Sequence, residues 1–139
     1  MRIMAIDYGD ARTGLAVCDK DELLASPAGV IAERDRERLL ERLAETAAEQ
    51  RAELLVLGYP KNMDGSTGER ARKCEQLAAD LRERTGLEVA LWDERRTTVA
   101  AHDILNVTDV RGKRRKQVVD AVAAVLILEG YMVYRKRES

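Results

Sequence analysis

Histidine and cysteine are scarce in this sequence. Among 139 residues there is one histidine, His102, and two cysteines, Cys18 and Cys74, which lie far apart and form no Cys-x-x-Cys pair. Zinc sites are built from imidazoles and paired thiolates, so we expect no zinc centre, and a lone histidine gives little support to a histidine-based triad. We interpret His102 as a helix-surface or packing residue and both cysteines as small core residues in a reducing compartment.

Several other signals are missing. The sequence has no Gly-x-x-x-x-Gly-Lys phosphate loop and no Gly-x-Ser-x-Gly nucleophile elbow. The longest apolar stretch near the C-terminus, 118–128, is interrupted by Asp120 and is too short to cross a bilayer. The N-terminus also lacks a charged-then-apolar leader. These absences predict a soluble, cytoplasmic protein with no membrane partner.

Length and composition fit one domain. With 45% hydrophobic residues and only Pro27 and Pro60 to interrupt the chain, we expect a single unit over residues 1–139 in which strands and helices alternate. The expected strands cover residues 3–7, 13–19, 29–31, 54–57 and 87–92. The expected helices cover about 35–51, 66–86 with a capping box from Ser66 to Glu69, a segment capped by Thr97 or Thr98, and 117–131.

This order of elements predicts an α/β fold with a mixed five-stranded sheet. The first three strands are joined by tight connections and should be antiparallel, whereas the later strands follow helices and should be parallel, with helices on both faces. Ligands bind such sheets at the carboxyl ends of parallel strands, where Asp7 and the pair Asp93 and Glu94 fall. The alternative for Asp7, which stands two residues before Gly9, is an ordinary turn residue.

Asp120 is a further acid, in unusual surroundings. Its neighbours over 118–128 are apolar, and an unpaired buried carboxylate is so unfavourable that it should be paired, protonated or bound to a cation. Helix spacing places Ala123 and Ala124 on the same side as Asp120, and these small side chains would let this face approach the first strand closely. A salt bridge to an arginine such as Arg12 or Arg95 is the alternative.

Carboxylates that converge on one edge of a sheet repel one another, and a divalent cation with oxygen ligands compensates this repulsion. We therefore expect Mg²⁺ or Mn²⁺ as the cofactor. A pair of such ions about 4 Å apart suits phosphoryl chemistry, because it activates a water and stabilises the leaving oxygen without a side-chain nucleophile.

Basic residues gather although the net charge is only −1. Five of the six residues in 111–116 are basic and predict a loop that can neutralise phosphates, and 135–137 forms a second cluster. An ordinary solvated loop is the alternative. The segment 57–68 places Asn62 and the start of a helix beside the same sheet edge. It could guide a nucleic-acid backbone, or serve only as a tight connection.

Five segments in order resemble the YqgF/RuvX family of bacterial RNase H-like nucleases. The resemblance covers nearly the whole chain, and it implies an RNase H-like fold and phosphodiester cleavage that depends on Mg²⁺ or Mn²⁺. The implied role is maturation of the 5′ end of pre-16S rRNA or resolution of Holliday junctions. The segments are Ile6-Asp-Tyr-Gly, Gly14-Leu-Ala-Val, Gly58-x-Pro-x-Asn-Met-Asp-Gly65, Asp93-Glu-Arg-x-Thr97 and Asp120-x-x-Ala-Ala124.

Position in these motifs implies that Asp7, Glu94 and Asp120 are the catalytic and metal-binding acids. Glu94 is preferred to Asp93 for its longer reach. Asp10 stands where many relatives carry a small or hydroxyl residue, so it either adds a fourth acid or caps the turn. The residues expected to contact nucleic acid are Arg12, Asn62, Arg95, Lys113, Arg114 and Arg115.

The favoured hypothesis is a metal-dependent nuclease that acts on an rRNA precursor as a monomer or homodimer. A homodimer would favour branched DNA, since two-fold symmetry can place two sites on paired strands. A non-catalytic nucleic-acid-binding module is disfavoured, because three acids repel phosphate unless metal intervenes. An actin-like ATPase is disfavoured by length, because those proteins close two such domains over a nucleotide.

Replacing both Arg114 and Arg115 with alanine is expected to weaken nucleic-acid binding and to flatten its dependence on salt, because fewer counterions are released from phosphate. Anisotropy titrations of a labelled RNA at several salt concentrations measure both effects. An unchanged slope would identify the basic segment as ordinary solvated surface.

Overall fold

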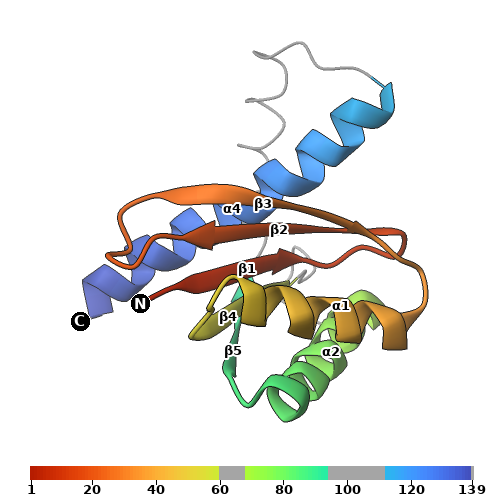
Figure 1. The fold of residues 1–139 in the computed structure, drawn as a ribbon, viewed down its shortest axis with the longest axis horizontal. Coiled ribbons are helices and arrows are strands. Elements are labelled where there is room, and N and C mark those ends of the chain that lie inside the picture. Colours follow the sequence, from red (N-terminus) through yellow and green to blue (C-terminus); the bar gives the residue numbers. More distant parts are fainter. Residues whose placement is uncertain (60–67, 94–111, 139) are drawn as a thin grey trace.

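The computed structural model describes residues 1–59, 68–93 and 112–138 (Figure 1). The helix expected after Thr97 or Thr98 lies outside these ranges. Within them the elements are, in order, β1 (Ile3–Asp7), β2 (Arg12–Cys18), β3 (Ala25–Ala32), α1 (Arg36–Glu49), β4 (Leu54–Tyr59), α2 (Glu69–Thr85), β5 (Glu88–Asp93) and α4 (Gly112–Glu138).

The described strands form one five-stranded sheet in the order β3-β2-β1-β4-β5. β2 pairs antiparallel with both β1 and β3, whereas β4 pairs parallel with both β1 and β5. Helix α1 precedes β4 and helix α2 precedes β5, so each parallel pairing follows a helical crossover. The predicted mixed α/β architecture is confirmed, and β1 occupies the centre of the sheet.

Helix α1 begins and packs as its sequence indicates. The Asp35 carboxylate caps it by accepting the backbone N–H groups of Glu37 at 2.9 Å and Arg38 at 3.2 Å. Apolar residues at helical spacing form one buried stripe that packs against the sheet, while charged residues fill the rest of the surface. The buried residues are Leu39, Leu40, Leu43 and Ala47.

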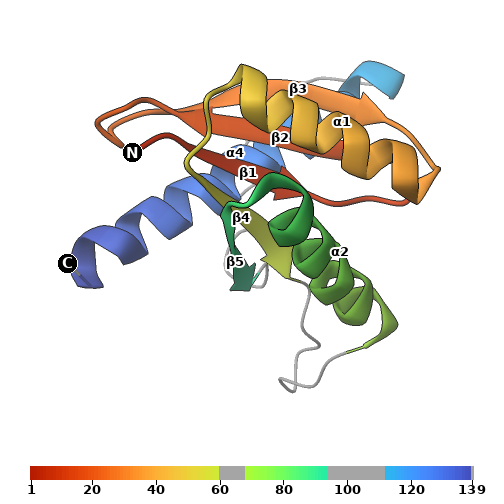
Figure 2. The same cartoon turned by 60° about the horizontal axis from the view of Figure 1, so that its bottom comes forward.

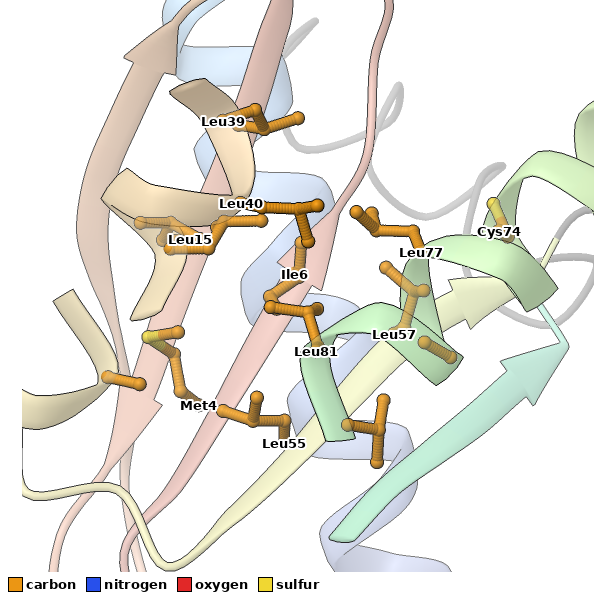
Figure 3. Packing of buried hydrophobic residues seen from close by; sticks show 14 of the residues in the cluster. Met4, Ile6, Leu15, Leu39, Leu40, Leu55, Leu57, Cys74, Leu77 and Leu81 are labelled. Atoms are coloured by element: carbon orange, nitrogen blue, oxygen red, sulfur yellow. The ribbon is translucent and has the colours of Figure 1, made fainter. Parts of the chain in front are cut away.

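Side chains of β1 alternate between two cores. Met4 and Ile6 belong to the core beneath α1 and α2, where leucines from both helices meet the sheet (Figure 3). Ile3 and Ala5 belong to the core beneath α4 on the opposite face. Figure 2 shows α1 and α2 in front of the sheet and α4 behind it. Helices thus cover both faces, as predicted.

Helix α2 starts differently from the expectation. Its N-cap is Gly68, which makes no side-chain capping hydrogen bond, and the helix begins at Glu69. The predicted capping box from Ser66 is therefore wrong. The end agrees with the prediction, because Gly86 adopts the left-handed conformation (φ 72°) and its N–H donates to the Arg82 carbonyl at 2.9 Å.

Two elements are longer than the sequence pattern indicated. α4 begins at Gly112, so the backbone of 112–116 is helical and the predicted basic loop is wrong over this range. Apolar periodicity missed this start because the first turns carry lysine and arginine, which favour helices but leave no hydrophobic signal. β3 spans Ala25–Ala32 rather than 29–31, since Pro27 and Gly29, typical of turns, are tolerated in this edge strand.

Both cysteines are free and buried, as expected of core residues. The Cys18 sulfur accepts the Ile3 N–H at 3.2 Å and donates to the Met1 carbonyl at 3.4 Å. Burial raises the pKa of the Cys18 thiol, which favours its neutral form.

In the described part of the chain, no helix combines the length and the apolar character needed to cross a membrane.

Gly130 in α4 is a site where alanine should destabilise the protein. A Cβ there would lie 2.9 Å from Cζ2 of Trp92, a rigid and buried ring. We expect Gly130→Ala to lower the free energy of unfolding by about 1–3 kcal/mol, the usual cost of overpacking. Chemical denaturation followed by circular dichroism measures this change.

Repeating the substitution in a protein without the Trp92 ring separates the effect of the clash on stability from the effect of helix propensity. In a Trp92→Leu protein the same Gly130→Ala change should be stabilising, because alanine favours a helix by up to about 1 kcal/mol over glycine. A loss of equal size in both backgrounds would contradict the packing explanation.

Candidate active site

The parallel strands β1, β4 and β5 end at one edge of the sheet. Their register aligns Ile6 with Leu57 and Leu57 with Leu91, so the three strands stop at nearly the same level. Asp7, Tyr59 and Asp93 are their last residues. This carboxyl edge is where α/β sheets bind ligands.

Asp7 is half-buried and faces the α4 side of the sheet. Its strand alternates, and Ile3 and Ala5, which share its parity, pack in the core beneath α4. Across the strand pair Asp7 lies opposite Gly14, which is buried and adds no side chain beside the carboxylate. Gly14 belongs to β2. Arg12, the first residue of that strand, stands two residues before Gly14 and shares its face.

Asp93 faces the other side. In β5 Val89 belongs to the core beneath α1 and α2, whereas Trp92 belongs to the core beneath α4. By alternation Asp93 shares the face of Val89. Asp7 and Asp93 therefore end the two strands that flank β4, at the same edge of the sheet, but they lie on opposite faces.

Helix α4 covers the face of the sheet on which Asp7 lies. α4 contacts β1, and Ala124 is fully buried in the same core as Ala5, whereas Ala123 is half-buried. Further along the helix, Nε of Arg135 donates to Glu22 at 2.9 Å, in the turn that also meets the chain start. α4 thus runs opposite to β1. Its turn before Ala124, which includes Asp120, lies toward the end of β1 that carries Asp7.

Six further predicted site residues divide into two groups of three. Asn62, Glu94 and Arg95 lie outside the described residues. Lys113, Arg114 and Arg115 belong to the first turns of the α4 backbone. Across the described ranges alone, no group of three or more potential metal-ligating side chains occurs. The three-acid hypothesis therefore stays a prediction, of which the structure describes the Asp7 side chain.

Asp10 is engaged by an arginine from α2. Nη1 of Arg70 lies 3.1 Å from Oδ1 of Asp10, and Nη2 of Arg70 donates to the Tyr8 carbonyl. The Arg70 guanidinium also stacks over the Tyr8 ring, 5.4 Å from its centroid. Of the two roles that the sequence left open, this ion pair favours a role in holding the turn rather than a fourth acid of the site.

Sequence reasoning missed Arg70. It belongs to a charged run, Glu69-Arg-Ala-Arg-Lys73, that reads as the ordinary start of a helix. The signal that could have found it is the placement of that helix start beside the sheet edge that Asp7 ends.

Tyr59 connects the edge to α2 by a hydrogen bond from its hydroxyl to Oε1 of Glu75. This bond to a carboxylate, together with burial, raises the pKa of Tyr59 to about 12. The end of β4 is thereby tied to the helix that packs against it.

Comparison with known proteins decides the family. A family model described as "RuvX: Holliday junction resolvase" matches residues 1–134. The chain belongs to the RuvX family. The fold agrees: T. thermophilus RuvC in complex with a Holliday junction substrate superposes with a TM-score of 0.63 at 15% identity, over 100% of this chain and 98% of that one.

Two RuvX-family relatives carry a more specific name. A protein of Lachnospira eligens is 42% identical over 99% of this chain and 100% of its own length, and one of Agathobacter rectalis is 42% identical over 96% of each. Both are named "Putative pre-16S rRNA nuclease". The predicted family is therefore confirmed over the whole chain.

The Tyr59 contact predicts a pH dependence of stability in this RuvX-family chain. The folded-state pKa lies above the ordinary value of 10, so the hydrogen bond stabilises fully below pH 10 and its contribution is lost as the pH rises towards 12. We expect the free energy of unfolding to fall less over this interval in Tyr59→Phe. Urea titrations at pH 9 and pH 11.5 measure the difference.

Glu75→Gln is the matched control, because it keeps an acceptor but removes the charge. Its alkaline loss should be smaller and should be complete at a lower pH than in the natural protein, because the folded-state pKa of Tyr59 is then raised less. Identical pH profiles for all three proteins would contradict the assigned cause.

Proposed function

We propose that this RuvX-family protein is a nuclease that uses Asp7, Glu94 and Asp120 to hydrolyse phosphodiester bonds at the carboxyl edge of the sheet. The observation that carries the proposal is the position of Asp7. It ends the central strand on the α4 face, opposite Gly14. Helix α4 crosses this face and brings the turn that precedes Ala124 toward the same end.

The face of Asp7 also supports the choice between the two neighbouring acids of β5. Asp93 lies on the α2 face, so it is poorly oriented to act with Asp7. We therefore retain Glu94 as the second acid, in agreement with the resemblance of the Asp93-Glu-Arg motif.

The donor chemistry fits Mg²⁺ or Mn²⁺. Carboxylate oxygens on rigid elements suit hard divalent cations. The cysteine on the α4 face, Cys18, contacts Met1 at the opposite end of β1, so its thiol lies away from Asp7. Asp7, Glu94 and Asp120 would hold the ions, which when bound activate water and offset charge on the phosphate. Divalent metal is general among nucleases of this fold, and its use here belongs to the proposal.

The chain's own residues have separate tasks in this scheme. The central strand holds Asp7 rigidly, because its neighbours Ile3 to Ile6 are fully buried. Gly14 adds no side chain beside that carboxylate, and Arg12 on the same face offers a cation to the nucleic-acid backbone. Asn62, Arg95 and the basic first turns of α4 extend this binding surface in the proposal.

An rRNA precursor is the proposed substrate, in keeping with the name shared by the two relatives at 42% identity. The second candidate is branched DNA. It is favoured by the description of the matching family and by the fold shared with RuvC. Both substrates present the same phosphodiester chemistry, so the site residues are the same in either case.

The test compares cleavage by the natural protein and by Asp7→Asn, with Mg²⁺, with Mn²⁺ and with EDTA. The substrates are a labelled RNA that spans the 5′ end of 16S rRNA and a four-way DNA junction. We expect cleavage of the RNA with metal, none with EDTA, and a rate at least about 100-fold lower in the variant, as for loss of a metal ligand.

Asp21→Asn is the matched control. It makes the same change at an exposed position in the turn between β2 and β3, far from the carboxyl edge. Its cleavage rate should equal that of the natural protein. Cleavage that persists in EDTA, or that survives Asp7→Asn, would contradict the proposed site, and faster cleavage of the junction would favour the second substrate.

A further inference from the structure

The Arg70 side chain joins the start of α2 to the turn that follows β1. Two of its contacts anchor the guanidinium: the hydrogen bond from Nη2 to the Tyr8 carbonyl, and the stacking over the Tyr8 ring. The third contact, to Asp10 at 3.1 Å, offsets its charge. The anchors and the counter-charge therefore come from different groups, and the counter-charge can change while the guanidinium stays in place.

The pair with Asp10 is open to water. The Arg70 side chain is 41% exposed and the Asp10 side chain 68% exposed. Ion pairs at such exposed positions are weak and are screened by salt, so another anion can displace the carboxylate. The contacts to Tyr8 and Asp10 engage two of the five guanidinium N–H donors, and a phosphate can be held by a fork of two.

The position of this pair matters as much as its exposure. Tyr8 and Asp10 directly follow Asp7, so the Arg70 guanidinium lies at the carboxyl edge of the sheet. Tyr8 packs against the core beneath α1 and α2, so the pair lies on the α2 side of this edge, whereas Asp7 faces α4. A nucleic-acid strand that is cleaved at Asp7 and crosses the edge reaches that side. Its phosphates would then pass close to the turn that Arg70 holds.

We propose that Arg70 binds a backbone phosphate of the nucleic-acid substrate and that Asp10 competes with this phosphate for the guanidinium. Asp10 thereby lowers the affinity for nucleic acid, and a bound strand moves Arg70 from the carboxylate to the phosphate. This inference rests on the proposed function, because it takes nucleic acid as the ligand at this edge.

The test measures affinity rather than cleavage. Binding of a fluorescein-labelled RNA hairpin with a 5′ extension, and of a labelled four-way DNA junction, is followed by anisotropy in EDTA. The variants are Asp10→Asn, Arg70→Ala and their combination. Asp10 is exposed, so Asp10→Asn should leave the fold intact. Thermal unfolding of each variant checks that it is folded.

The chain offers a closely matched control pair. Arg84 near the end of α2 lies 3.5 Å from Glu37 of α1, with exposures of 41% and 74%. Glu37→Gln and Arg84→Ala make the same changes of charge in a similar pair that joins α2 to α1 rather than to the turn after β1. They report the effect of net charge alone.

We expect Asp10→Asn to bind both probes about two- to five-fold more tightly, as for release of an exposed ion pair. Arg70→Ala should bind several-fold more weakly and lower the salt slope by about one. The double variant should bind as weakly as Arg70→Ala, and the two control variants should stay within about 1.5-fold of the natural protein, below the range of a released pair.

Three results would overturn the role of Arg70: an unchanged affinity of Asp10→Asn, a gain that survives in the double variant, or an equal gain in Glu37→Gln. These results leave the proposed nuclease intact. A natural protein that binds neither probe would instead overturn the proposed function, and this role with it. A protein that binds but does not cleave would contradict the nuclease, while the affinities above still decide the role of Arg70.

Discussion

The parallel pairing of β1 with β4 is the interaction on which the rest of the structure depends. It places the fully buried segment Ile3 to Ile6 at the centre of the sheet and brings the ends of β1, β4 and β5 to one level. Strand side chains alternate, so a slip of one residue in this register would exchange the two faces. Asp7 would then turn into the layer beneath α1 and α2, and Ile6 would face α4.

Much of this architecture follows from local patterns. The helical stripe of α1, with its Asp35 cap, is visible in the sequence because both signals are strong and short-range. The short apolar run at β4 likewise indicates a strand buried on both faces, and it is buried along its whole length. Predictions failed where apolar residues do not mark the boundary. α4 starts among lysines and arginines, and β3 is an edge strand interrupted by Pro27.

The site was harder to predict than the fold, because it depends on which face each residue takes. The sequence placed Asp7 and Asp93 at strand ends, but only the neighbours of Val89 and Trp92 assign Asp93 to the α2 face. The partner of Asp10 is sixty residues away along the chain. An exposed pair of this kind leaves no pattern in the sequence, since neither residue is constrained by burial.

The geometry of α4 relates position 120 to the end of β1 in the proposed site. Four helical residues rise about 6 Å, and two strand residues advance about 6.7 Å. Ala124 and Ala5 share one core, so the step back along α4 to position 120 is similar in length to the step forward along β1 to position 7. Inserting a single residue between 120 and 124 would turn the preceding helix by about 100°, leaving the core intact while carrying position 120 away from the face that it is proposed to share with Asp7.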